Sequence, residues 1–292
     1  MKNAWLIVNG YLNSPKFDEI YNWLVKAAGD KDIQLKILPG DRVASILQIN
    51  SGQMDWRVRP DFVLFWDKDT VLARALEQEG FRVYNSARAI EICDDKAKTF
   101  VELKNTDIPM PRTYSAPMCF ERKYPDYSFL MQAAKYLEYP MIIKACKGSF
   151  GVQVYLADDL EGAKTIIEKL QPGEFIMQEL VEASKGKSAR IQVVGGEIVC
   201  SMKLTNGQDF VSNVTSGGTM EEYSPTEEEQ AIALKATKAL GLDFAGVDII
   251  WDADGKPLLC EVNSNAHFKN IFDCTGVNVA EKIIDYIIAD AK

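Results

Sequence analysis

The sequence predicts an α/β protein, α+β in its later part, with more than one domain. Apolar strand-like runs alternate with helix-like segments over residues 1–90, which is typical of βαβ units around a parallel sheet. Apolar runs joined by turns that contain glycine or aspartate follow further along, and they favour antiparallel hairpins. The 292 residues are enough for two or three small domains with ample cores.

The composition limits the classes of partner. A formal net charge of −9 argues against a nucleic acid as the main partner. No apolar run approaches the length of a membrane span. Residues 1–10 are expected to form a buried strand rather than a signal peptide, because the apolar run is short and a polar loop follows. The six cysteines include no C-x-x-C pair, which fits free thiols in a reducing cytoplasm.

We expect a first domain over residues 1–90. Its strand-like runs are residues 5–8, 35–38, 62–66 and 82–84, and its helix-like stretches are residues 17–28 and 70–79. Gly80 is a typical stop for the second helix. The first strand lacks the G-x-G-x-x-G turn of a dinucleotide site, whereas Asn9-Gly10 at its end is a candidate ligand-facing loop.

A second domain is expected over residues 91–175 and a third over residues 176–292. For the second we predict a helix that opens at Asp94 or Asp95, helices at 129–137 and 160–170, and strands at 140–144 and 152–156. A strand at 175–181 lies at the boundary. For the third we predict a hairpin of 190–194 with 198–204, a helix at 227–240 opened by a Thr226/Glu229 capping box, a second hairpin, and a helix at 279–289.

The second hairpin, residues 246–251 and 256–263, carries the strongest chemical signal. With a loop of even length, Asp248 lies opposite Leu259, so Asp248, Glu261 and Asn263 share one face. The opposite face then carries Val247, Ile249, Trp251, Leu258, Cys260 and Val262. Two carboxylates held together repel unless a cation lies between them, and oxygen ligands suit Mg²⁺. The alternative is a polar outer face of an edge hairpin, and a loop of odd length would break the argument.

Two further segments are candidates for anion binding. The loop 144–152 joins two apolar strands, has glycines that let backbone N–H groups approach an anion, and has lysines at 144 and 147. Its alternative is an ordinary glycine-containing turn. In the first hairpin a two-residue Gly195-Gly196 turn pairs Arg190 with Ser201, and Lys203 then shares the face of Arg190. Two cations on one buried side need an anion, whereas the alternative is a solvated basic face.

Two weaker signals complete the set. The strand that ends at Gln178-Glu179-Leu180-Val181 enters a loop whose backbone could contact an adenine edge, with Glu179 or Glu182 near a sugar. Taken alone, this segment favours the plain strand end over an adenine contact. Asn213 lies in a polar, glycine-bearing loop with Gly217-Gly218, and such loops are more often functional or mobile than structural. The alternative is a disordered surface loop.

Together these segments resemble the ATP-grasp superfamily and, within it, the RimK-like carboxylate–amine ligases. From about Asn85 onward the pieces occur in the family's order: Asp95-Lys96, residues 108–113, Lys144 with residues 147–152, Gln178-Glu179, Arg190, Asn213 with Gly217-Gly218, residues 246–248 and residues 261–263. Residues 1–90 correspond by position to the family's Rossmann-like pre-ATP-grasp domain. Residues 264–270 are also similar to the amino-acid-carrier-protein ligases of lysine biosynthesis.

The resemblance implies ATP and Mg²⁺ as cofactors, with two ions and with Mn²⁺ as an alternative metal. Lys96 and Lys144 would hold phosphates under a loop formed by Lys147, Gly148, Ser149, Phe150 and Gly151. The adenosine end would be held by Gln178, Glu179, Leu180, Val181, Glu182 and Asn213. Arg190 and Lys203 would face the γ-phosphate and the acyl phosphate, and Asp248, Glu261 and Asn263 would bind the metal ions. Two departures are Ser188, where an acidic residue is frequent, and Lys203, where an arginine is usual.

The implied activity is an ATP-dependent carboxylate–amine ligase that forms an amide bond through an acyl phosphate. Its substrates would be a small-molecule, peptide or carrier-protein carboxylate and an amine. The alternatives are a small-molecule kinase on the same fold and a silent ATP-binding regulator, and the full set of metal ligands argues against the regulator. The single histidine, His267, is open to a substrate contact, a base or a structural role. The sequence names neither substrate and leaves a homo-oligomer open.

Overall fold

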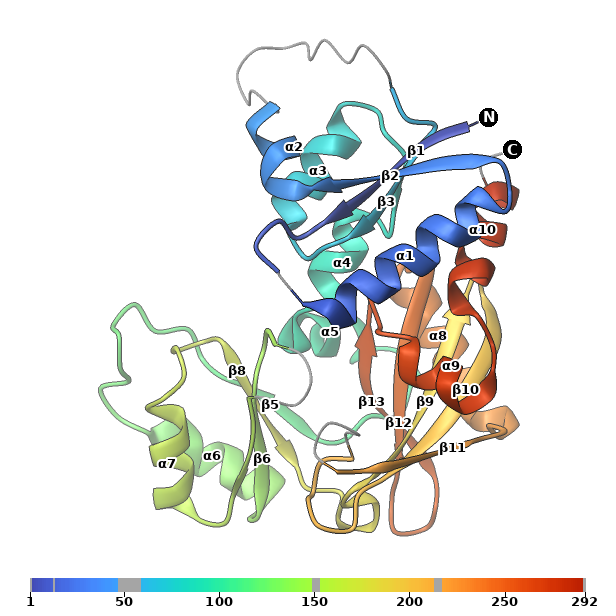
Figure 1. Cartoon of the computed structure of the whole chain (residues 1–292). Coiled ribbons are helices and arrows are strands. Elements are labelled where there is room, and N and C mark those ends of the chain that lie inside the picture. The colour runs from blue at the N-terminus through green and yellow to red at the C-terminus, as the bar shows by residue number, and fades with distance from the viewer. Residues whose placement is uncertain (1, 13, 47–58, 149–152, 213–216, 291–292) are drawn as a thin grey trace.

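The computed structural model describes residues 2–12, 14–46, 59–148, 153–212 and 217–290. Three sheets organise these residues, with strand orders β2-β1-β3-β4, β5-β8-β6-β7 and β11-β10-β9-β12-β13. Figure 1 shows the first sheet at the top, the second at the lower left and the third at the lower right.

The first sheet contains β1 (Lys2–Val8), β2 (Ile33–Pro39), β3 (Phe62–Trp66) and β4 (Val83–Tyr84), and all of its strand pairs are parallel. This confirms the parallel sheet predicted from the alternating pattern. Helix α1 (Pro15–Gly29) packs on one face, in a core with Leu6 and Leu64. Helix α3 (Thr70–Gln78) packs on the other face, in a core with Ile7 and Val63. The strands are apolar on both faces because both faces are covered.

The second sheet is antiparallel and forms a small separate unit, which we call the lid. Its strands are β5 (Thr113–Ser115), β6 (Met141–Ala145), β7 (Val154–Ala157) and β8 (Phe175–Glu179). Helices α6 (Ser128–Leu137) and α7 (Leu160–Ile167) share its core. The predicted boundary between residues 175 and 176 is wrong, because it would cut β8, which pairs with β5 and β6 up to Glu179.

The third sheet is also antiparallel. Its strands are β9 (Lys187–Val194), β10 (Glu197–Thr205), β11 (Thr219–Glu222), β12 (Phe244–Trp251) and β13 (Pro257–Asn263). Helix α8 (Glu227–Leu240) covers one face. The 3₁₀ helix Glu182–Ser184 leads from the lid into β9, and α2 (Gly40–Ile46) and α9 (Lys269–Thr275) follow β2 and β13.

The last helix, α10 (Val279–Asp290), returns to the first sheet and packs against α1 in a shared core. Figure 1 shows α10 next to α1 beside the first sheet. Between the first sheet and the lid lie α4 (Ala87–Cys93) and α5 (Lys96–Leu103), which Ser86 and Asp95 cap through their side chains. Asp95, not Asp94, is thus the residue that opens α5.

The capping box predicted for α8 is confirmed, with Thr226 and Glu229 exchanging hydrogen bonds. Glu229 is 1% exposed, and its carboxylate also accepts the indole N–H of Trp251 at 2.6 Å and the hydroxyl of Tyr223 at 2.9 Å. This buried carboxylate therefore joins the start of α8 to β12 through neutral donors.

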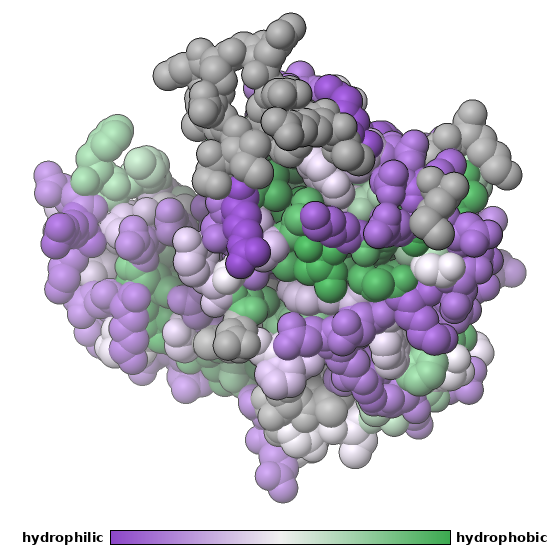
Figure 2. Space-filling model, turned by 45° about the horizontal axis from the view of Figure 1, so that its top comes forward, coloured by the Kyte–Doolittle hydropathy of each residue, from purple (hydrophilic) through white to green (hydrophobic). Residues whose placement is uncertain are grey.

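The surface is mainly hydrophilic on the face that Figure 2 shows, and apolar residues gather there in separate patches. Within the described ranges, every helix is too short or too polar to span a lipid bilayer. The six cysteines are free thiols.

Candidate active site

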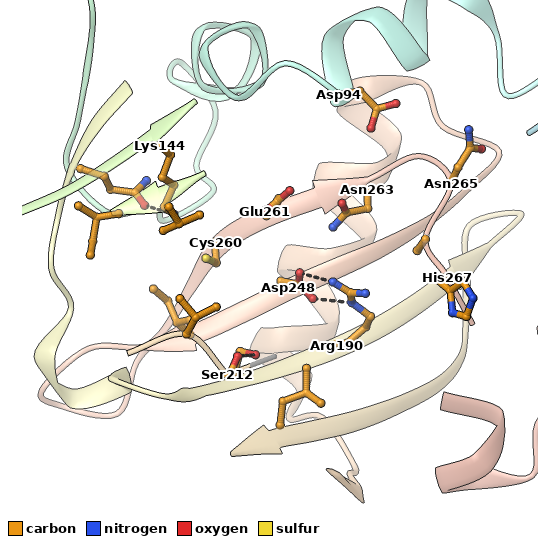
Figure 3. Close-up of a pocket in the computed structure, with 18 of the residues that line it drawn as sticks. Asp94, Lys144, Arg190, Ser212, Asp248, Cys260, Glu261, Asn263, Asn265 and His267 are labelled. Atoms are coloured by element: carbon orange, nitrogen blue, oxygen red, sulfur yellow. Dashed lines mark hydrogen bonds and ion pairs between the residues drawn. The ribbon is translucent and has the colours of Figure 1, made fainter. Parts of the chain in front are cut away.

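A cleft of about 560 Å³ lies where the three sheets meet. The lid contributes Lys144 and Gln178 to its lining, the third sheet contributes Arg190 and Asp248, and the first sheet contributes residues that follow β1 and β3. Figure 3 shows Lys144 at one end, Asp94, Asn265 and His267 at the other, and the β12–β13 hairpin between them. Ligand sites of proteins typically occupy such clefts between units.

The β12–β13 hairpin brings Asp248, Glu261 and Asn263 to one side, and all three line the cleft. The predicted pairing of Asp248 with Leu259 is wrong. The turn leaves out residues 252–256, an odd number, and a β-bulge at Cys260 then shifts the register so that Asp248 lies opposite Glu261. The odd turn and the one-residue bulge offset each other, so Asp248, Glu261 and Asn263 lie on one face as expected. The expected register, by contrast, is wrong.

The same bulge changes the core face of β13. Leu259 is 3% exposed and packs with Val262 in the core under α8. Cys260 lines the cleft instead, and Leu258 pairs with Ile250, which also lines the cleft. The prediction that Leu258 and Cys260 lie on the face opposite Asp248 is therefore wrong.

Arg190 and Asp248 form a two-pronged ion pair on adjacent strands. Arg190 Nε donates to Asp248 Oδ1 at 2.7 Å and Nη2 donates to Oδ2 at 2.6 Å. The side chains are 20% and 14% exposed. Burial raises the pKa of the Asp248 carboxyl, and the Arg190 guanidinium opposes this rise. In this state the guanidinium supplies the positive charge that the buried carboxylate needs.

Lys203 does not share the face of Arg190, which corrects the second register prediction. Val199 is an extra residue on β10, so Arg190 pairs with Met202, and Lys203 pairs with Ala189 on the opposite face. Lys203 Nζ lies 5.7 Å from the ring centroid of Trp251. The cleft-lining residue of this part of β10 is Leu204, which pairs with Ser188.

Lys144, on the lid strand β6, lines the cleft, whereas Lys96, the first residue of α5, lines a small neighbouring pocket that shares Lys144 and Glu261 with it. Lys144 is 8% exposed, and its Nζ donates to Gln178 Oε1 at 2.7 Å, while Gln178 Nε2 donates to Thr113 Oγ1 at 3.0 Å. Lys96 Nζ lies 3.6 Å from Glu261 Oε1 and donates to the Gly148 carbonyl at 3.5 Å. Lys96 therefore links the Glu261 carboxylate on β13 to the start of the lid loop.

The segment predicted to contact the adenosine is partly in place. Glu179, Leu180 and Val181 line the cleft, but the Glu179 carboxylate accepts Arg112 Nε at 2.6 Å and the Arg112 backbone N–H at 2.7 Å. Glu182, which is also predicted to hold the adenosine, is exposed and is not among the described residues that line the cleft. Lys147 and Gly148 are exposed at the end of the described lid loop. The predicted residues Ser149, Phe150, Gly151 and Asn213 lie outside the described part of the chain.

The far end of the cleft contains residues that the sequence analysis missed. Asp67 and Asp94 line it together with Asn265. Asp94 forms an ion pair with Lys68 at 3.0 Å and accepts the Ser264 hydroxyl at 2.5 Å. The signal that could have found Asp67 is its place directly after the buried strand β3, at the carboxyl end of a parallel sheet.

His267 also lines the far end, and burial lowers its pKa to about 4, assisted by the charges of Lys16 and Arg190. Its Nε2 lies 3.1 Å from the carbonyl oxygen of Lys16. A carbonyl only accepts, so Nε2 carries the hydrogen and Nδ1 is unprotonated at neutral pH. His267 is therefore a neutral side chain packed edge-on against Phe17 at 5.8 Å between ring centroids.

The donor set on β12 and β13 fits a hard divalent cation. Two carboxylates face each other across one ladder rung, and the Asn263 amide follows on the same face. The protein's own cations, Arg190 and Lys96, currently compensate these carboxylates. Within the described ranges, groups of three or more His, Cys, Asp or Glu that could hold a metal ion do not occur. A metal bound here would therefore share its coordination shell with an amide and with ligand oxygens.

Comparison with known proteins agrees with this geometry. Residues 93–287 match the model of the RimK-like ATP-grasp domain. The chain is 29% identical over 286 residues to human N-acetylaspartylglutamate synthase A, covering 93% of this chain and 72% of the relative. It is 32% identical over 226 residues to a probable alpha-L-glutamate ligase of Vibrio atlanticus, covering 76% and 72% respectively.

The fold is also that of solved ATP-grasp enzymes. The structure of D-alanine–D-alanine ligase from Bacillus anthracis superimposes with a TM-score of 0.75 at 18% identity, covering 100% of this chain and 97% of the ligase. The family match spans more than half of the chain and includes the cleft's β9, β12 and β13. The chain therefore belongs to the RimK-like family of ATP-grasp proteins.

Proposed function

We propose that this protein is an ATP-dependent carboxylate–amine ligase that forms an amide bond through an acyl phosphate. The observation that carries the proposal is one cleft whose lining combines Asp248, Glu261 and Asn263 with the cations Arg190 and Lys144. Carboxylate and amide oxygens suit a metal–nucleotide complex, and the cations suit phosphates. The family of the chain supports the same activity.

ATP would occupy the end of the cleft between the lid and the third sheet. The apolar side chains of Ile142, Leu180 and Ile250 line this end and suit an adenine ring. Because Arg112 holds the Glu179 carboxylate, we assign the adenine contacts to the backbone of residues 179–181. Lys144 and Lys96 would hold phosphate oxygens, and the lid loop that begins at Lys147 would cover them.

Asp248, Glu261 and Asn263 would hold two Mg²⁺ ions, with Mn²⁺ as a substitute. Bound there, the ions would neutralise phosphate charge. Since Arg190 now engages both Asp248 oxygens, ion binding would release its guanidinium toward the phosphates. Lys203 has no part in this proposal, because it lies on the other face of the sheet.

The reaction would proceed in two displacements. A substrate carboxylate oxygen attacks the γ-phosphorus, the bond to ADP breaks, and an acyl phosphate forms. An amine nitrogen then attacks the acyl carbon, inorganic phosphate leaves, and the amine loses a proton. Arg190 and the lysines would stabilise the transferred phosphoryl group by charge, which makes a protein nucleophile unnecessary.

The first sheet would serve as the pre-ATP-grasp domain, and the lid and third sheet would form the ATP-grasp core. Residues 1–90 and 91–179 are the proposed extents of the first two units, and the remainder forms the third. Two relatives are named for a glutamate-containing product and as a glutamate ligase, so an amino acid is the proposed amine. The proposed acceptor is a small-molecule, peptide or carrier-protein carboxylate.

ADP release tests the proposal. The purified protein is incubated with Mg²⁺ and ATP, and with a panel of carboxylates, amines, or both, and products are identified by mass spectrometry. A ligase yields ADP and an amide only when both substrates are present. A phosphorylated product that accumulates from one substrate, with no amide on addition of any amine, would instead support the small-molecule kinase.

A further inference from the structure

The first sheet has a crevice that opens into the far end of the cleft. In the order β2-β1-β3-β4, β1 is followed by α1 on one face of the sheet and β3 by α3 on the other. The loops after β1 and β3 thus diverge, and ligands of parallel sheets bind at such points beyond the carboxyl ends of the strands. Asn9 follows β1, Asp67 follows β3, and both line the cleft.

Asp67 has acceptor capacity that its neighbours leave unused. Asn9 Nδ2 donates to its Oδ1 at 3.2 Å, and the Lys68 backbone N–H donates to the same oxygen at 2.6 Å. Over the described ranges Asp67 forms no ion pair, and no protein donor reaches Oδ2. The carboxylate is half-buried next to Trp66 and near Tyr21, whose pKa rises to about 12 through burial and the charge of Asp67. A partly desolvated carboxylate served only by neutral donors favours a cation.

Three cations of this region already have carboxylate partners, and Lys16, near His267, is a further cation. Lys68 pairs with Asp94 at 3.0 Å, and Lys269 pairs with Asp273 on α9. Arg190 pairs with Asp248 nearer the centre of the cleft. The cleft thus has cations where the phosphates would bind and an uncompensated anion at Asp67. This polarity suits a substrate with a positively charged group at the far end.

We propose that Asp67 anchors the ammonium group of the acid substrate that enters this crevice, so that the activated carboxylate belongs to a free amino compound such as an α-amino acid. This ammonium group is not the amine nitrogen that attacks the acyl phosphate. The proposal rests on the proposed ligase function for the role of that substrate, and it makes Asp67 a specificity-determining residue. An ammonium group supplies three donors and the opposite charge. The Trp66 and Tyr21 rings beside it suit a cation as well.

Binding without turnover tests this proposal. Thermal unfolding is measured with Mg²⁺ and ADP present, and with α-amino acids, their N-acetyl derivatives, or butylamine added. At least one free amino acid should raise the melting temperature of the wild type, and its N-acetyl derivative should not. Butylamine tests whether the amino group alone is sufficient. The affinity for that amino acid should fall about 10- to 100-fold in Asp67→Asn, the usual loss for a charge-assisted hydrogen bond.

Two variants control for charge and shape. Asp285→Asn removes a surface carboxylate on α10 that pairs with Lys31 at 2.7 Å and does not line the cleft. This variant should bind the amino acid with the affinity of the wild type. Asp67→Glu keeps the charge and should retain part of the affinity. Equal binding of acetylated and free compounds, no response to any amine, or unchanged affinity in Asp67→Asn would overturn the proposal. Amine binding through Asp67 without ADP release in the earlier assay would overturn only the ligase function.

Discussion

Replacing Arg190 by methionine removes the counter-charge of Asp248 and keeps an unbranched side chain of similar length. The pair has two short hydrogen bonds, and its side chains are 20% and 14% exposed, so water screens it little. Removing one partner of a buried ion pair costs about 3–5 kcal/mol, because the other charge stays buried and unpaired. Since this pair borders the cleft, we expect the free energy of unfolding to fall by about 3 kcal/mol in metal-free buffer.

Urea denaturation followed by circular dichroism, with and without millimolar Mg²⁺, measures this effect. Mg²⁺ should restore part of the loss in Arg190→Met, because a bound cation can replace the guanidinium beside Asp248. The matched control is Arg88→Met, which breaks a surface pair with Glu102 of the same length, 2.6 Å, at 60% and 34% exposure. It should cost less than about 1 kcal/mol. Equal losses in the two variants, or no response of Arg190→Met to Mg²⁺, would refute the reasoning.

Three further predictions concern the walls of the site. In Gly246→Ala the new Cβ would lie 2.5 Å from Ala266 Cβ, so the segment that carries Asn265 and His267 must shift. Steady-state kinetics should show that KM rises more for the acid and amine substrates than for ATP. Equal increases in KM for ATP and for the substrates would contradict this prediction. Glu229→Ala removes the capping box and the acceptor of the Trp251 indole, so urea denaturation should show that the free energy of unfolding falls by about 2–4 kcal/mol. The control Glu228→Ala, at the neighbouring residue, should lower it by less than about 0.5 kcal/mol. A similarly small loss in Glu229→Ala would contradict the prediction. His267 has a folded-state pKa of about 4, below its ordinary 6.5, so between these pH values the unfolded chain binds more protons than the folded chain. The free energy of unfolding should therefore fall as pH decreases from about 6.5 to about 4, and this pH dependence should be smaller in His267→Asn. An imidazole pKa near 6.5 in an NMR titration of the folded protein would show that His267 is not the source.

The sequence predicted which side chains of the last hairpin converge, but not by which register. Alternation of apolar and polar residues reveals the faces of a strand, and a bulge adds one residue without a clear mark in the pattern. In β13 the bulge at Cys260 offsets the odd turn, so Asp248 and Glu261 still meet. In β10 the bulge at Val199 has no such offset, and Lys203 moves to the other face.

The far end of the cleft could not be predicted from local patterns. Lys144 is the last residue but one of a buried strand and Lys96 follows a helix cap, so both have a signal within a few residues. Asp67 gains its place only from the order of strands in the first sheet, and Asp94 gains its place from contacts with Lys68 and Ser264, far away in the chain. Such long-range pairings become visible only once the units are packed together.

The central claim is that one face of β12 and β13 binds the divalent ions of a nucleotide. Electron paramagnetic resonance of Mn²⁺ in the presence of ADP tests it directly, because bound and free Mn²⁺ give different signals. The wild type should bind Mn²⁺ together with ADP, and the double variant Asp248→Asn/Glu261→Gln should bind it at least about tenfold more weakly, since both charged ligands are lost. Equal Mn²⁺ affinity in the two proteins would contradict the account.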